Sequence, residues 1–157
     1  MALVKATMTI ELTAAFAAPA AEPIKPGKDI AKAYKSYLLL GMNSGGFPAS
    51  NVIDAPTGMA IGGVFASQLL IGTAIGAAIA GHLSTMALTF MSGMQIGPPA
   101  APPTHMGPLM QLFSSLPPSS LDYAKELSDI LDKWTKGWVV SGIYPPPSAA
   151  PFSGPLS

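Results

Sequence analysis

A long stretch of this sequence carries no ionised side chain: no Lys, Arg, Asp or Glu lies between Asp54 and Asp122. Gly, Ala, Pro and Met are frequent in the same stretch. A surface in contact with water normally carries charges of both signs. We therefore expect most of this stretch to face a membrane or neighbouring protein rather than bulk water.

Charged residues are scarce in the chain as a whole. They make up 10% of its 157 residues, whereas about 25% is usual in soluble domains. The formal net charge is +0, and every basic residue is a lysine. A neutral chain without arginine lacks the basic surface of a nucleic-acid-binding protein. The absence of cysteine excludes disulfides, a thiol nucleophile and thiolate metal ligands.

Hydrophobic spacing predicts a mainly α fold, with one short C-terminal β-strand and extended Pro-rich arms. A single small helical domain is expected over residues 1–144, followed by a Pro-rich C-terminal arm at 145–157. The predicted helices lie at about 7–18, 28–40, 58–81 and 121–136, and the predicted strand at about 138–144.

The helix at 121–136 has the clearest signals. Ser119 stands three residues before Asp122, which suits a capping box with Asp in place of the usual Glu. Gly137 is well placed to end the helix. Its apolar face consists of Leu121, Ala124, Leu127, Leu131 and Trp134, and acidic and lysine residues alternate on the other face.

Prolines and short apolar segments occupy the remaining connections. Glu11 and three threonines interrupt the apolar N-terminal segment, which favours an amphipathic helix over a signal peptide. A Pro-rich loop is expected from Gly97 to Pro108, followed by a short amphipathic turn at Leu109–Phe113. Residues 84–93 are expected to form a further short helix or strand.

Small residues repeat at four-residue spacing within the predicted helix at 58–81. Either another backbone approaches the helix closely there, or the helix is poorly formed and breaks near Gly72. Residues 61–81 also have the length of a membrane span. However, no lysine, Trp or Tyr flanks them as such spans usually require.

The sequence offers no recognisable constellation for catalysis. His82 and His105 have no carboxylate or serine at a spacing typical of a triad, and two isolated histidines are weak metal ligands. The acidic residues between Asp122 and Asp132 alternate with lysines, which is typical of a solvated helix face. No phosphate-binding or dinucleotide-binding fingerprint is present. We predict a non-enzymatic protein without cofactor or metal; an enzymatic alternative would rest on the two histidines.

The C-terminal third has a distinctive layout. A helix with an apolar inner face runs through residues 133–135, a short β run follows at 137–140, and a Pro-rich tail ends in Phe152–Pro155. Together with the opening Leu3–Thr7 and the Gly/Ala-rich middle, this layout resembles a group of small structural proteins of tailed-phage virions. The likeness extends over most of the chain, although residues 86–94 and 102–108 depart from it.

This resemblance implies a tail or baseplate protein that is present in several copies and works by packing alone. We therefore expect a virion structural protein, assembled in the host cytoplasm, whose partners are copies of itself and other tail or baseplate proteins. The alternative is a small membrane protein, holin-like or an accessory subunit, with a transmembrane helix at 61–81. The candidate interface residues are uncharged: Gly62, Phe65, Leu69, Gly72, Gly76, Met91, Met94, Pro98, Pro102, Trp138 and Phe152.

Overall fold

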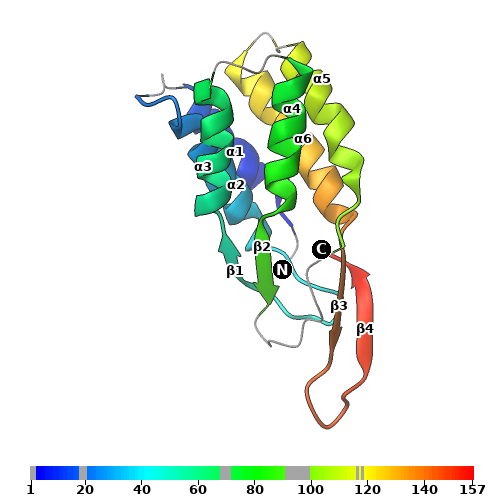
Figure 1. Ribbon diagram of the computed structural model, residues 1–157. Coiled ribbons are helices and arrows are strands. Elements are labelled where there is room, and N and C mark those ends of the chain that lie inside the picture. Colours follow the sequence, from blue (N-terminus) through cyan, green and yellow to red (C-terminus); the bar gives the residue numbers. More distant parts are fainter. Residues whose placement is uncertain (1–2, 18–20, 68–71, 91–99, 116, 118) are drawn as a thin grey trace.

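Helices account for most of the chain, as the hydrophobic spacing predicts (Figure 1). The structure is a computed structural model that describes residues 3–17, 21–67, 72–90, 100–115, 117 and 119–157. The helices are α1 (Lys5–Ala17), α2 (Lys25–Leu38), α3 (Ala55–Ser67), α4 (Thr73–Ser84), α5 (Met106–Ser114) and α6 (Ser120–Lys136), with a short 3-10 helix, η1 (Pro103–His105), before α5. The strands are β1 (Ala49–Ile53), β2 (Ala87–Phe90), β3 (Val139–Ile143) and β4 (Pro151–Pro155). The mainly α fold class is confirmed.

In the described part of the chain, the α-helices form a ring in which each helix packs on the next. Contacts run in order from α1 to α6 and close between α6 and α1. Figure 1 shows α3, α4 and α5 side by side at the front of the ring, with α1, α2 and α6 behind them. The strands lie at one end of the ring, and the hairpin of β3 and β4 projects farthest from the helices.

The prediction of one helix over residues 58–81 is wrong. Helix α3 ends at Ser67, α4 begins at Thr73, and the two helices pack on each other. Gly72 has φ +54° and ψ −122°, a conformation that an α-helix cannot contain. Within the described residues, every helix is too short or too polar to cross a lipid bilayer.

Two glycines of this region allow close backbone contact, which was one of the two interpretations of their spacing. A Cβ atom on Gly62 would lie 2.6 Å from the carbonyl oxygen of Ile24, and one on Gly76 would lie 2.4 Å from that of Leu109. Helix α3 therefore packs against the start of α2, and α4 against α5, at distances that only glycine permits. The other interpretation, a break near Gly72, is also observed.

The predictions for α1, α2 and α6 agree with the structure to within a few residues. The hydroxyl of Ser119 caps α6 by accepting a hydrogen bond of 3.1 Å from the amide of Asp122. Helix α5 is longer than the amphipathic turn predicted at Leu109–Phe113. Pro108 does not prevent this, because it lies in the first turn, where its missing N–H has no intrahelical partner.

Two antiparallel sheets of two strands each complete the fold. Strand β3 lies where a strand was predicted, and β2 lies within residues 84–93, where a short helix or strand was expected, whereas β1 and β4 were not predicted. Strand β1, which lies outside every predicted helix and strand, is extended because it pairs with β2, with Val52 opposite Leu88. Residues 151–155 of the predicted C-terminal arm form β4, which pairs with β3 along its whole length.

A buried cluster of aromatic and polar side chains joins α2 to α6 at the centre of the ring. The ring of Trp134 stacks on that of Tyr34. The hydroxyl of Tyr34 shares a hydrogen bond of 2.6 Å with that of Thr135, and the hydroxyl of Tyr37 donates one of 2.7 Å to Asp132. These bonds satisfy polar groups that would be costly to bury alone.

Candidate interaction surfaces and pockets

Ionised residues are confined to one side of the helix ring. The charged residues lie on α1 (Lys5, Glu11), α2 (Lys25, Lys28, Asp29, Lys32, Lys35) and α6 (Asp122, Lys125, Glu126, Asp129, Asp132, Lys133, Lys136), or in the connections before α2 and α3 (Glu22, Asp54). Helices α3, α4 and α5 and the four described strands carry none. Because these three helices are neighbours in the ring, their outward faces form one continuous uncharged surface, here called the neutral layer.

Large apolar side chains are exposed on the neutral layer and on β3. On the layer, Met106 of α5 is 40% exposed, whereas Met59 of α3, which is 62% exposed, lies at the border with the charged residues Lys28, Lys32 and Asp54. On β3, the exposed fractions are 41% for Val139 and 37% for Ile143. A single exposed apolar residue is ordinary, but several on surfaces without ions are typical of contact sites.

Four of the candidate interface residues pack inside the subunit. Gly62 and Gly76 face the backbones of α2 and α5. Trp138 is buried against Trp134, and Phe152 is buried against Phe47 and Tyr144. These four residues make their contacts within one chain. We therefore do not include them among the residues proposed to touch a neighbouring subunit.

The other candidates are partly buried or lie outside the described residues. Phe65 is half-buried, with its ring centroid 6.0 Å from that of Phe113. A Cβ atom on Gly72 would lie 3.8 Å from Oγ of Ser114, and the carbonyl of Pro102 accepts a hydrogen bond from the indole of Trp134. The candidates outside the described residues are Leu69, Met91, Met94 and Pro98.

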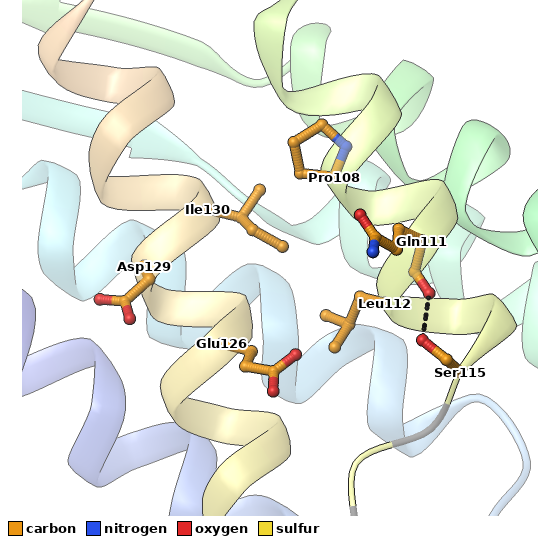
Figure 2. Close-up of a pocket in the computed structure, with 7 residues that line it drawn as sticks. All are labelled: Pro108, Gln111, Leu112, Ser115, Glu126, Asp129 and Ile130. Carbon is orange, nitrogen blue, oxygen red and sulfur yellow. Dashed lines mark hydrogen bonds between the residues drawn. The ribbon is translucent and has the colours of Figure 1, made fainter.

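A groove of about 270 Å³ runs between α5 and α6 (Figure 2). Helix α5 lines it with Pro108, Gln111, Leu112 and Ser115, and α6 with Glu126, Asp129 and Ile130. A second space of about 270 Å³ continues along the same two helices and shares Pro108, Asp129 and Ile130 with the first.

The two carboxylates of the groove do not converge on a common point. Figure 2 shows that Glu126 points across the groove toward α5, whereas Asp129 points away from it. The carboxylate of Asp129 is paired with Lys5 of α1. A general acid and a general base have to lie within hydrogen-bonding distance of the reacting atoms of one bound substrate. Two carboxylates that diverge cannot do this, so this pair does not form a catalytic site.

The two histidines differ in burial and in contacts. His82 is half-buried on α4, whereas His105 is buried and stacks on Trp134 with ring centroids 3.7 Å apart. The Nε2 atom of His105 lies 3.0 Å from the carbonyl oxygen of Ala80 and 3.2 Å from Oγ of Ser84. Sequence reasoning missed this contact with Ser84, because no local spacing relates residues on α4 to η1.

The contact between Ser84 and His105 is not a nucleophile–base pair. A carbonyl oxygen can only accept, so Nε2 carries a proton that it donates to Ala80. It therefore cannot take the proton of Ser84, whose hydroxyl also donates to Ala80. Nδ1 of His105 is buried without a hydrogen-bond partner among the described atoms. This histidine therefore joins η1 to α4 and has no means of activating the serine.

Burial lowers the pKa of His105, and this predicts a stability that depends on pH. As the pH falls below about 6.5, the unfolded chain binds a proton that folded His105 resists, so the free energy of unfolding decreases. His105→Phe retains a ring against Trp134 and is expected to flatten this dependence between pH 8 and 5. Urea unfolding at several pH values measures it. The control is His82→Gln, and an unchanged slope in His105→Phe would contradict the prediction.

Among the described residues, no group of three or more His, Asp or Glu side chains is arranged to hold a metal ion. Comparison of the chain with known protein families, with curated proteins and with solved structures finds no match.

Proposed function

We propose that this chain is a non-enzymatic structural subunit of a tailed-phage virion, in its tail or baseplate, which assembles in multiple copies through uncharged surfaces. The observation that carries the proposal is the confinement of ionised residues to one side of the ring. A free monomer exposes the neutral layer to water and has no net charge to keep it dispersed. A subunit within an assembly covers such a surface with protein.

The pockets give less support to a catalytic or ligand-binding function. The groove between α5 and α6 is open to solvent rather than enclosed, whereas ligand sites usually bury most of the ligand's surface. Its carboxylates diverge, and the buried histidine is held by a backbone carbonyl. Packing surfaces are therefore the better supported basis for function.

Quantitative mass spectrometry of gradient-purified particles from cells that carry the gene tests this proposal. We expect the chain in several copies per particle, and particles from a nonsense mutant of the gene to lack an intact tail or baseplate. Recovery of the chain only outside particles, together with normal particles from the nonsense mutant, would overturn the proposal.

Truncation at residue 145 is a poor test of assembly. It removes β4 and the side chains of Phe152 and Leu156, which are 8% and 2% exposed. Loss of this burial destabilises the subunit itself, at about 25 cal/mol for each Å² of apolar surface. Point substitutions on exposed positions separate assembly from folding more cleanly.

A further inference from the structure

The hairpin of β3 and β4 has one face toward the body of the subunit and one face toward solvent. The amide of Leu156 donates to Trp138, and the amide of Tyr144 donates to Ala150. The cross-strand pairs of even-numbered residues are therefore hydrogen-bonded through their backbones. The pairs of odd-numbered residues are the non-hydrogen-bonded pairs that alternate with them. Val140, Gly142 and Phe152 on the even face are buried.

The odd-numbered residues form an exposed, mainly apolar face. Val139 lies opposite Pro155, and Ile143 opposite Pro151. Between them, the hydroxyls of Ser141 and Ser153 are hydrogen-bonded at 3.0 Å. Apart from half-buried Ser141, all of these residues are exposed. We call these six residues the hairpin face.

Proline blocks the outer edge of β4 against another strand. The backbone N atoms of odd-numbered residues point away from β3, and two of the three odd positions in β4 are Pro151 and Pro155. Proline has no N–H, so in this fully described strand only Ser153 has an amide on that edge. An edge of this kind does not accept a further strand. The hairpin therefore offers a partner its side-chain face rather than its edge.

Three exposed glycines lie on the helices of the neutral layer. A Cβ atom on Gly63 of α3, Gly81 of α4 or Gly107 of α5 would have no heavy atom of a non-adjacent residue within 4 Å. Glycine inside a helix costs about 1 kcal/mol relative to alanine, and at these positions no packing within the subunit requires it. Helices with bare backbone at their surface allow another element to approach closely.

We propose that the hairpin face of one copy packs on the neutral layer of the next copy. This inference rests on the proposed function as a self-assembling subunit, and it identifies the two surfaces that meet. It is a contact between two different surfaces, so each copy donates a hairpin to one neighbour and receives a hairpin from another. Such contacts generate rings or helical stacks rather than closed pairs.

Charge favours an occupant of the neutral layer that has no ionised groups of its own. An ionised partner group placed there would lose water without gaining a counter-ion, which is costly. The hairpin carries no ionised residue between Gly137 and Ser157, so it matches the layer in this respect. It also projects beyond the helices, where it can reach a neighbouring subunit (Figure 1).

Complementation between two variants tests the proposal. Ile143→Lys places a charge on the hairpin face, and Gly81→Lys places one on α4, the middle helix of the neutral layer. Each is expected to weaken self-association of the purified chain by at least about 30-fold, measured by sedimentation velocity. The matched control is Ala14→Lys on exposed α1, which adds the same charge on the ionised side and is expected to leave self-association unchanged.

The mixture of the two variants gives the decisive result. Ile143→Lys retains an intact neutral layer and Gly81→Lys retains an intact hairpin, so together they are expected to form a dimer that cannot grow further. Circular dichroism melting checks that each variant is folded.

Three outcomes would overturn the inference. In one, the wild-type chain assembles, but the single variants assemble equally well or their mixture stays monomeric, which means that the hairpin face does not pack on the neutral layer while the proposed function stands. In another, Ala14→Lys weakens assembly as strongly as the two variants. In the last, the wild-type chain stays monomeric at every concentration. The particle measurement described above then decides the proposed function separately.

Discussion

Gly76→Ala is expected to destabilise the protein by about 3 kcal/mol or more, because the added methyl group meets backbone that cannot move away. A Cβ atom on Gly76 would lie 2.4 Å from the carbonyl oxygen of Leu109 and 2.5 Å from Cα of Met110. Overpacking against movable side chains already costs about 1–3 kcal/mol. Here α4 and α5 have to separate along their whole contact. Urea unfolding of dilute protein measures the change.

Gly81→Ala is the matched control for this prediction. It makes the same substitution in the same helix, but its Cβ atom meets open space. The higher helix propensity of alanine is expected to stabilise the fold by about 0.5–1 kcal/mol. Similar stabilisation by both substitutions would show that helix propensity rather than backbone contact governs α4.

Trp134→Ala is expected to lower the free energy of unfolding by about 3–5 kcal/mol, a large part of the stability of a domain this size. Trp134 is 1% exposed and packs against three other rings, those of Tyr34, His105 and Trp138. Its indole also donates a hydrogen bond of 2.7 Å to the carbonyl of Pro102. The substitution therefore leaves a cavity at the junction of α2, α6 and η1, together with an unsatisfied carbonyl.

Differential scanning calorimetry of Trp134→Ala and Leu121→Ala separates this packing effect from a general effect of truncating a large side chain on α6. Leu121 lies on the same helix but is 43% exposed, so its truncation is expected to change the stability by about 0.5 kcal/mol or less. Equal effects of the two substitutions would contradict the role assigned to Trp134.

Sequence periodicity was sufficient for the elements whose signals are local. Helix α6 has a cap at Ser119 and a stop at Gly137, and its apolar face repeats at helical spacing. The structure confirms the start and the end of α6 that these signals predict. Strand β3 was also located, because Val139 and Val140 favour extended backbone and follow that stop.

The elements that were missed depend on partners distant in the chain. Strand β1 is extended because it pairs with β2, which lies beyond α3 and α4. The break at Gly72 was only one of two interpretations, since a glycine in a helix and a glycine at a turn look alike in sequence. Likewise, glycine spacing predicted close contact at Gly62 and Gly76 without revealing that the contacting backbone belongs to the same chain.

The uncharged character of α3, α4 and α5 could be predicted from the sequence, but their arrangement in the fold could not. The uncharged stretch between Asp54 and Asp122 indicated contact with protein or lipid. It could not show that α3, α4 and α5 are adjacent in the ring, because that adjacency arises from tertiary packing. The contact of His105 with Ser84 could not be predicted for the same reason.

The ionised side of the ring is itself electrically polarised. Lysines outnumber acidic residues on α2 (Lys25, Lys28, Lys32 and Lys35 against Asp29), and the reverse holds on α6 (Asp122, Glu126, Asp129 and Asp132 against Lys125, Lys133 and Lys136). When Glu22 and Asp54 beside α2 are counted, the α2 side has one net positive charge and α6 has one net negative charge, so each subunit has a small dipole running across α1 from one helix to the other. Dipoles orient molecules as they approach and are screened by salt. Added electrolyte would therefore slow the encounter of two copies while leaving the strength of an uncharged contact almost unaltered.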